Sequence, residues 1–420
     1  MLRSLFSAIS GLQAHQTKMD VVGNNIANVN TVGYKSQTTV FEDTLSQLLR
    51  NGSAPTSTTA GTNPAQVGLG VKVAEISTNF SQGSTQSTGR PTDFMINGDG
   101  FFITQAGGQN QYTRAGSFDI DATGRLVTPD GAMLQGWMVD PNTGTVNTNG
   151  PVQNLSIPYG SVMAPAMSTA GALNGNLPAD STGTTPPGSA LVVQAVMYNA
   201  LGDAHPITYT FTPTSTAGQW NVAVQDENGT SLAPSPATIT FDTTTGKIAT
   251  PASGTLTFDP TQDAALGAWT NPVSVDLNKL SQFGGKSTLA VTDGVAGAGN
   301  AMGTLSSFSL GNDGSITGVY SNGLTKPIGQ LALASFANPA GLTKAGNSSY
   351  VVGDNSGSPN IGVAGTGGRG TLTAGALEMS NVDLSQEFTG MIIAQRGFQA
   401  NSKVITTDDQ ILQDLVNMKQ

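Results

Sequence analysis

The chain has 420 residues, 10 % of them charged, and a formal net charge of −10 at pH 7. Its 17 lysines and arginines are scattered, which argues against a nucleic-acid surface, because such surfaces need clustered cations. The absence of cysteine excludes disulfide bridges, thiolate metal sites and cysteine nucleophiles. With 53 glycines and 21 prolines, the composition is typical of an extended, turn-rich β protein rather than a cytosolic enzyme.

An amphipathic helix is predicted at the start of the chain, within residues 1–30. Apolar residues recur there at heptad spacing, together with two in companion positions: Leu5, Leu12, Met19 and Ile26, accompanied by Leu2 and Ile9. The alternative is a cleaved signal peptide, but Ser4, Ser7 and Ser10 interrupt the apolar stretch and no small-residue cleavage site follows. We therefore expect the helix to stay in the protein. No apolar run reaches the ~20 residues that a membrane span requires, so a membrane-spanning protein is not expected.

The segment GNNIANVNTVGYKS, residues 23–36, predicts the end of this helix. It carries amides and turn formers where the apolar period stops: Asn24, Asn25, Asn28, Thr31, Gly33, Tyr34 and Lys35. Asparagine caps helices and bonds to nearby backbone, and glycine allows a sharp break. We expect the amides to satisfy backbone groups that the helix end leaves unpaired.

The middle of the chain is predicted to form two nested antiparallel β domains. Residues 31–66, with 362–371, form an extended connecting region, in which residues 40–50 are a candidate short helix. Alternating strands and turn motifs place a first β domain at residues 67–147 and 289–361. A second β domain is inserted at residues 148–288, with strands expected at 191–198, 207–212, 220–225 and 237–242.

A second helix is predicted at the other end, within residues 372–420. Its heptad series is longer than the first: Leu384, Met391, Phe398, Ile405 and Leu412, with Phe388 in the companion seam. Asp383 or Ser380 is the expected N-cap. The predicted fold is therefore mainly β with terminal α-helices that form a coiled-coil-like layer.

Catalytic and metal-binding candidates are few. Asp119, Asp121, Gly124 and Asp130 resemble a Ca²⁺ loop, but the flanks read as strands and a hairpin turn is the simpler interpretation. The histidines are His15, expected on the polar face of the first helix, and His205, far away in the sequence. Since these groups make no plausible metal site or catalytic triad, neither an enzyme, nor a cofactor, nor a metal is expected.

The two heptad stripes need partners. In an average protein such stripes cover a globular core, but here they lie at opposite ends of a β-rich chain. Helices gain most of their stability from packing, and further copies of the same chain could provide it. The stripes therefore favour self-assembly.

In several stretches of its sequence, the chain resembles the flagellar rod and hook axial proteins. The family's "NNIANxxTxGYK" element is matched at Asn24 to Lys35, and residues 67–73, 89–103 and 112–127 are similar to its first β domain. The family's C-terminal helix is matched by GALEMSNVDLSQEFTGMIIAQRGFQANSKVITTDDQILQDLVNMK, residues 375–419. The matches cover about the first 130 and the last 50 residues, with weaker similarity at 305–340.

The resemblance implies an extracellular structural subunit of the flagellum that polymerises helically into the hollow, curved hook. It implies terminal helices in an inner tube, export by the flagellar type III apparatus without a cleaved signal, and contact with distal rod, hook cap and hook–filament junction proteins. Two alternatives stay open. One is a distal rod subunit, since residues 47–66 look like a rod-type insertion, and the other is a secreted adhesin with a receptor site in residues 148–288.

Overall fold

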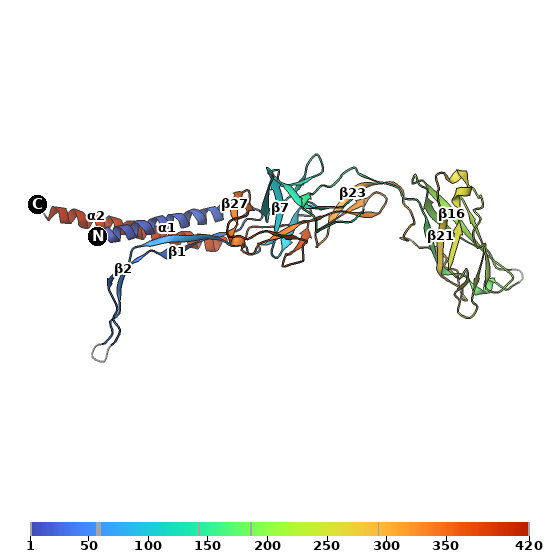
Figure 1. The fold of residues 1–420 in the computed structure, drawn as a ribbon, viewed down its shortest axis with the longest axis horizontal. Coiled ribbons are helices and arrows are strands. Elements are labelled where there is room, and N and C mark those ends of the chain that lie inside the picture. Colours follow the sequence, from blue (N-terminus) through green and yellow to red (C-terminus); the bar gives the residue numbers. More distant parts are fainter. Residues whose placement is uncertain (1, 56–59, 142, 185–186, 293, 419–420) are drawn as a thin grey trace. The chain divides into compact units, whose positions relative to one another are not determined.

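A computed structural model describes residues 2–55, 60–141, 143–184, 187–292 and 294–418 (Figure 1). The chain forms two compact units. The first comprises Met1–Pro158, Phe308–Gly318 and Pro327–Gln420, and the second comprises Tyr159–Ser307 and Val319–Lys326. The chain thus crosses between the units after residues 158, 307, 318 and 326. Three of these crossings lie inside strands, namely β23 (Gly303–Leu310), β24 (Ser315–Tyr320) and β25 (Thr325–Leu331).

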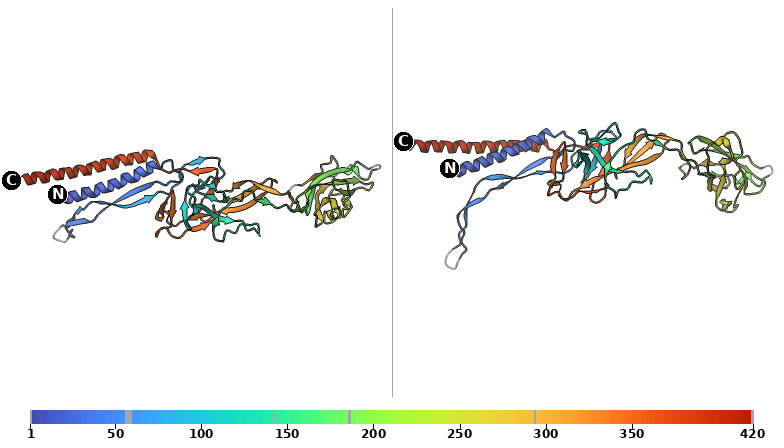
Figure 2. Two further views of the ribbon diagram at one scale, coloured as in Figure 1. Left: turned by 90° about the horizontal axis from the view of Figure 1, so that it is seen from above. Right: turned by 45° about the horizontal axis from the view of Figure 1, so that its top comes forward.

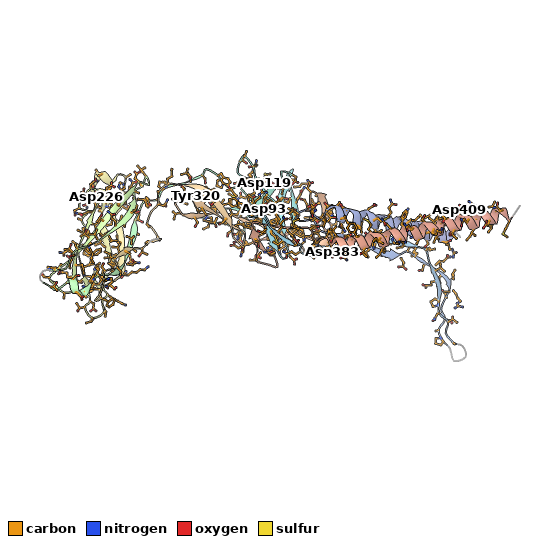
Figure 3. The ribbon with its side chains drawn as sticks, turned by 180° about the vertical axis from the view of Figure 1, so that it is seen from behind. Asp93, Asp119, Asp226, Tyr320, Asp383 and Asp409 are labelled. Atoms are coloured by element: carbon orange, nitrogen blue, oxygen red, sulfur yellow. The ribbon has the colours of Figure 1, made fainter. Side chains whose placement is uncertain are left out.

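Two terminal α-helices belong to the first unit, α1 (Leu2–Ala27) and α2 (Leu384–Asn417). They pack side by side, and the ribbon of β1 (Gln37–Asp43) and β4 (Val71–Thr78) lies against α1 (Figures 1 and 2). Asp383 is the N-cap of α2, because its carboxylate accepts hydrogen bonds from the N–H groups of Ser385 and Gln386. It lies at one end of α2, with Asp409 toward the other (Figure 3). Within the described ranges, no helix combines the length and apolarity needed to cross a membrane.

Helix α2 begins directly after Asp383, one of the two expected N-caps, and strands occupy part of the stretch between residue 372 and this cap. Two strands precede it, β30 (Thr371–Ala374) and β31 (Ala376–Glu378). They pair antiparallel with β6 (Phe94–Asn97) and β5 (Thr85–Ser87), respectively. The stretch before Asp383 therefore belongs to the β body, because strands far away in the sequence take up its backbone hydrogen bonds.

The short helix expected at residues 40–50 is a wrong prediction. The end of β1 and all of β2 (Ser46–Arg50) occupy this stretch, and β2 pairs antiparallel with β3 (Ala65–Gly68). Local helix propensity is a weak prior, and here the partner strands β3 and β4 override it.

The β body of the first unit is built on an antiparallel sheet with the order β25–β11–β7–β8–β28–β27. Its further strands are β7 (Phe101–Ala106), β8 (Gln109–Thr113), β11 (Met133–Met138), β27 (Thr343–Gly346) and β28 (Ser349–Val351). Short strands attach to it: β9 (Asp119–Ile120), β10 (Leu126–Val127), β12 (Gln153–Asn154), β26 (Leu333–Ser335) and β29 (Asn360–Gly362). Phe101, Tyr112, Trp137 and Tyr350 pack on it as an aromatic core.

The second unit contains two sheets with a shared apolar core. One has the order β15 (Leu191–Tyr198), β16 (Ala204–Pro213), β17 (Gln219–Gln225), β18 (Thr238–Phe241) and β19 (Ile248–Thr250), which includes the four strands predicted there. The other has the order β20 (Thr255–Phe258), β21 (Val273–Ser281), β14 (Ala170–Asn176) and β22 (Ala290–Val291). Trp220, Tyr209 and Phe258 are fully buried in this core. One detail differs from the expected antiparallel pairing, since β14 and β21 run parallel. Three short 3₁₀ helices (Ala179–Ser181, Pro260–Gln262 and Ala264–Leu266) and the strand β13 (Val162–Met163) complete the unit.

A buried ion pair joins the exit of α1 to the entrance of α2. The Lys35 Nζ donates to the Glu378 Oε1 at 2.6 Å and to the Ser81 carbonyl at 2.7 Å. The two charged side chains are 0 % and 1 % exposed. Burial lowers the pKa of Lys35, and the hydrogen bond and charge of Glu378 oppose this shift. The Arg114 Nη1 lies 3.5 Å from the second carboxylate oxygen, so one carboxylate serves two buried cations.

We predict that Glu378→Gln destabilises the first unit strongly. The substitution leaves Lys35 and Arg114 without a carboxylate, and breaking a buried pair lowers the free energy of unfolding by about 3 kcal/mol or more. The matched control is Glu42→Gln. Glu42 forms an ion pair with Lys72 at the surface, where the Glu42 side chain is 48 % exposed and the Lys72 side chain 61 %. This substitution should leave the free energy of unfolding almost unchanged, because exposed ion pairs contribute little to stability. Urea unfolding measures both, and equal losses for the two variants would contradict the prediction.

Candidate functional site

Small residues form the contact between α1 and α2. Ala8 and Ala14 of α1 and Ala394 of α2 are buried there. A Cβ atom added to Gly11 would lie 2.6 Å from the Asn401 Nδ2, and one added to Gly397 would lie 2.5 Å from the His15 ring. Such distances are too short for real side chains, so the glycines permit the close approach of the two helices.

Polar groups also lie in this contact. The Ser4 hydroxyl donates to the Asp408 Oδ2 at 2.6 Å, and Asp408 is buried. The His15 ring contacts the Phe41 ring of β1 edge to face, with centroids 5.8 Å apart. Burial, and then the neighbouring charge of Lys18, lower the pKa of His15. The expectation of His15 on a polar outer face is therefore wrong, because the ring lies half-buried between α1, β1 and α2.

The predicted heptad stripe of α1 is only partly covered in the single chain. Leu5, Leu12, Met19 and Ile26 are half-buried, and Ile9 is exposed. The side chain of Leu2 lies outside the described part of the structure. Sequence reasoning weighted the bulky residues and missed the small ones. The available indication of this contact was the spacing of small residues along each helix. They are Ala8, Gly11 and Ala14 on α1, and Gly390, Ala394 and Gly397 on α2.

Helix α2 exposes apolar side chains on more than one face. Of its predicted stripe, Met391, Ile405 and Leu412 are half-buried, while Leu384, Phe388 and Phe398 are exposed. Further large apolar side chains are also exposed: Ile392, Ile393, Val404, Ile411, Leu415 and Val416. Exposed apolar side chains that gather into patches are rare on monomers and mark interaction sites. Among the described residues, nothing covers these side chains.

Asn25 fixes the connector between α1 and the β body. Its fully buried side chain makes four hydrogen bonds. Its amide donates to the Gln37 carbonyl and to Glu387 of α2, while its oxygen accepts from the Tyr34 hydroxyl and the Gln37 N–H. A buried amide with every partner in place specifies one geometry. It ties both helices and the start of β1 together.

The other motif residues shape the helix exit. Asn28 donates to the carbonyl and the side chain of Asn24 and accepts from the Thr31 hydroxyl. Gly33 has a φ of +66°, and a Cβ there would lie 2.4 Å from the Ala115 backbone nitrogen. The predicted sharp break at Gly33 is confirmed, because only glycine fits this turn and this close contact. Lys35 then enters the buried ion pair with Glu378.

The β2–β3 hairpin exposes its apolar side chains to solvent. Leu45, Leu48, Leu49, Val67 and Leu69 are all exposed on the hairpin and its flanks. A lone two-stranded hairpin is marginally stable in water. The hairpin is therefore a second surface that lacks a partner among the described residues.

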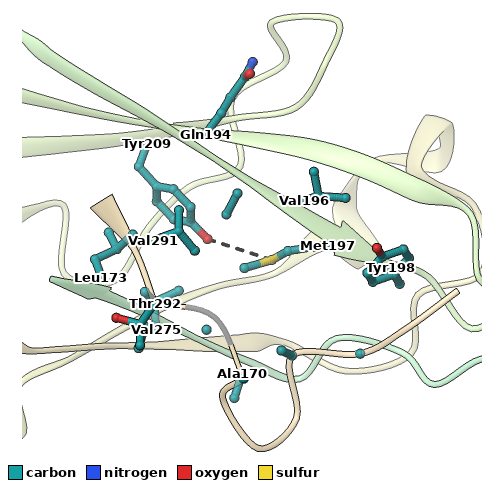
Figure 4. A pocket seen from close by; sticks show the side chains of 16 residues that line it. Ala170, Leu173, Gln194, Val196, Met197, Tyr198, Tyr209, Val275, Val291 and Thr292 are labelled. Carbon is teal, nitrogen blue, oxygen red and sulfur yellow. Dashed lines mark hydrogen bonds between the residues drawn. The ribbon is translucent and has the colours of Figure 1, made fainter. Parts of the chain in front are cut away.

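The remaining candidate sites have structural explanations. Asp121 accepts hydrogen bonds from the backbone and hydroxyl of Thr123 and from Arg125, and Gly124 follows with a φ of +84°, which describes a hairpin turn. In the described ranges, no three histidine, aspartate or glutamate side chains form a metal-binding group. A cavity of about 370 Å³ in the second unit, between β14, β15 and β22, has a largely apolar lining that includes Leu173, Met197 and Val291 (Figure 4).

Four family models match separate parts of the chain, of which two adjoin at residues 171 and 172. They are "Flagella basal body rod protein" at residues 5–35, "Flagellar hook protein FlgE/F/G D1 domain" at 95–171, "Flagellar basal body protein FlaE D2 domain" at 172–295 and "Flagellar basal body rod FlgEFG protein C-terminal" at 373–418. The terminal matches contain α1 with its connector and α2. The matches therefore cover both candidate assembly elements.

Individual proteins agree with these models. The match to the crystal structure of the Helicobacter pylori flagellar hook protein FlgE2 covers 68 % of this chain and 98 % of that chain, at 15 % identity and a TM-score of 0.47, so the likeness is distant. The flagellar basal-body rod protein FlgG of Bacillus subtilis is 33 % identical, with 100 % of both chains covered. The flagellar hook protein FlgE of Borreliella burgdorferi is 40 % identical, also with 100 % of both chains covered. The chain belongs to the flagellar hook protein family.

Proposed function

We propose that the chain builds the flagellar hook by helical self-assembly through its two terminal helices. One observation carries this proposal: α2 exposes large apolar side chains on more than one face, and nothing else in the described chain covers them. Burying each of them contributes about 1.5–3 kcal/mol. Neighbouring copies of the same chain would provide that burial in an inner tube, with the β units outside it.

Within this proposal the helix pair divides its surface between two tasks. Small residues such as Gly11, Ala14 and Ala394 hold α1 and α2 together inside one subunit. The bulky residues are left for contacts between subunits: Leu5, Ile9, Leu12, Met19 and Ile26 on α1, and Leu384, Phe388, Met391, Phe398, Ile405 and Leu412 on α2. Leu2 is assigned to the same set by its heptad position.

The connector passes force from the helices to the β body in this proposal. Asn25 and the pair Lys35–Glu378 fix the helix exit with buried hydrogen bonds. Asn28 and Thr31 lie half-buried on the same turn, where amides can meet a neighbouring copy. A hook must bend while it transmits torque, so a rigid joint inside each subunit leaves the bending to contacts between subunits.

The proposal includes a place and partners for the subunit. It is an extracellular structural protein rather than an enzyme, exported by the flagellar type III apparatus without a cleaved signal. It meets the distal rod, the hook cap and the hook–filament junction proteins at the two ends of the polymer. The family resemblance supports this finer part of the proposal, together with an amphipathic α1 that packs into the fold.

A distal rod subunit is the second candidate. The rod protein of Bacillus subtilis aligns over the whole chain, and the exposed β2–β3 hairpin lies where a rod-type insertion is expected. Electron microscopy of tubes assembled from the purified chain separates the two. Curved tubes are expected for a hook, and uniformly straight, stiff tubes would favour the rod.

We predict that Ile393→Asp blocks polymerisation. Ile393 is 56 % exposed in the single chain, so the substitution leaves the subunit folded but places a charge in the proposed interface. The matched control is Gln399→Asp, which makes the same charge change at an exposed polar position of α2. Sedimentation measures polymer, and circular dichroism checks the fold. Normal assembly of Ile393→Asp would remove this residue from the interface.

We also predict that acid loosens the helix pair through His15. Its pKa in the folded chain lies below the ordinary value of 6.5, so the unfolded helices bind the proton first as the pH falls through that value. Protection of α1 against hydrogen exchange in the polymer should therefore decrease below pH 6.5, and His15→Gln should abolish this dependence. An unchanged pH profile in the variant is the contrary result.

A further inference from the structure

Asparagine followed directly by glycine is a chemically reactive pair, and the chain contains it at six places. They are Asn51–Gly52, Asn97–Gly98, Asn149–Gly150, Asn174–Gly175, Asn228–Gly229 and Asn322–Gly323. The glycine nitrogen can attack the amide carbon of the asparagine side chain, because glycine has no Cβ to obstruct the approach. The attack requires an asparagine side chain that can rotate and a glycine N–H that no acceptor holds. The structure therefore decides which of the six pairs can react.

Three pairs are held by hydrogen bonds of both residues. In each pair the asparagine side-chain amide donates to one acceptor, and the glycine N–H donates to another group. The acceptors are Thr373 and Gln82 for Asn97–Gly98, the side chain and carbonyl of Asp226 for Asn228–Gly229, and Ala301 and Tyr320 for Asn322–Gly323. These bonds must open before the reaction can start, so the fold protects the three pairs.

Two further pairs are held by their backbones. Asn174–Gly175 lies within β14, which is paired with β21 on one side and β22 on the other. At Asn149–Gly150, the Asn149 N–H donates to the Asn147 side chain at 3.1 Å. The Gly150 carbonyl accepts a hydrogen bond from the ring N–H of the buried Trp137 at 2.8 Å. These contacts restrict the backbone rotation that would bring the glycine nitrogen to the amide carbon.

The pair Asn51–Gly52 differs from the other five, because it lies free in one arm of the β2–β3 hairpin. Strand β2 ends just before the pair, and the next pairing of the two arms is the bridge between Ser53 and Thr62. Asn51 and Gly52 therefore belong to no strand, and both are exposed. Within the described ranges, no hydrogen bond engages the Asn51 side chain or the Gly52 N–H.

The opposite arm of the hairpin explains this gap in the pairing. A Cβ atom added to Gly52 would lie 3.1 Å from the ring of Pro64, so a proline lies across from the pair. Proline has no N–H to donate, and the arms resume their pairing only at Arg50 with Ala65. The local sequence thus leaves this stretch of backbone without the bonds that hold the other pairs.

We propose that Asn51 is the preferred deamidation site of the chain. The Gly52 nitrogen loses its proton and bonds to the Asn51 Cγ, while the bond from Cγ to the side-chain nitrogen breaks and ammonia leaves with that proton. Water then opens the resulting cyclic imide at either carbonyl and gives aspartate or isoaspartate. Nothing is oxidised or reduced, and water is the co-reactant. The reaction takes place in the single subunit, so the proposal does not rest on assembly.

The modification would change the hairpin as the protein ages. Either product adds one negative charge close in sequence to the exposed side chains of Leu48 and Leu49. Isoaspartate also adds a methylene group to the backbone between Arg50 and Ser53, which are the two flanking points where the arms pair. An apolar, uncharged stretch of exposed hairpin thereby becomes charged and, in the isoaspartate form, altered in register.

Peptide mapping by mass spectrometry tests the proposal on the folded full-length monomer. The protein is incubated at mildly alkaline pH, and the conversion of each of the six asparagines to its acid form is followed over time. Conversion at Asn51 should be roughly tenfold or more faster than at Asn97, Asn228 and Asn322, since two hydrogen bonds must open at each of those pairs. Equal rates at the six pairs, or faster conversion at another pair, overturns the proposal.

The same measurement in urea separates the effect of the fold from that of the local sequence. Unfolding removes the bonds that protect the other five pairs, so the lead of Asn51 should largely disappear. If Asn51 leads by the same factor in urea, the structure does not select the site and the proposal fails.

Variants of exposed asparagines identify the product. Asn51→Gln should abolish the reaction in the hairpin, because the longer side chain would have to close a larger ring. Asn149→Gln is the matched control, since it makes the same change at another exposed asparagine that precedes glycine. An isoaspartyl methyltransferase should methylate the aged wild type and the aged Asn149→Gln variant, but not aged Asn51→Gln. Equal methylation of all three proteins would place the isoaspartate elsewhere and overturn the proposal.

Discussion

The buried contact between Lys35 and Glu378 holds together two parts of the chain that are 343 residues apart in sequence. Lys35 ends the turn after α1, and Glu378 ends the strand before α2. Their pairing places both helices at one end of the β body, and Asn25 fixes their direction through Gln37 and Glu387. Desolvation makes such a pair a poor source of net stability, so its value lies in specifying one geometry. The helix pair can present a defined surface because this joint is fixed.

The surface of the helix pair is divided by residue size. Glycine and alanine let the two helices approach closely, while several leucine, isoleucine and phenylalanine side chains of α2 stay exposed. If bulky residues formed the contact between α1 and α2, the same side chains would no longer be available for contacts between subunits of a polymer. The division therefore lets one pair of helices satisfy an internal and an external contact at once.

The sequence was sufficient for features that depend on local chemistry. The fold class, mainly β with terminal helices, is confirmed, as are the N-cap at Asp383, the turn at Gly33 and the strands of the second unit between residues 191 and 241. Features that depend on distant partners were missed. The apolar stretch at residues 40–50 becomes strand because β3 and β4 pair with it. Lys35 is buried because it pairs with Glu378, and no local sequence pattern predicts a pairing between residues so far apart in the sequence.

The four crossings between the two units have a mechanical consequence. A unit joined by one linker can swivel, and a single cut releases it. Here the backbone passes the boundary after residues 158, 307, 318 and 326, and three of the passages run through strands β23, β24 and β25. A twisting load on the second unit is therefore shared among parallel covalent paths.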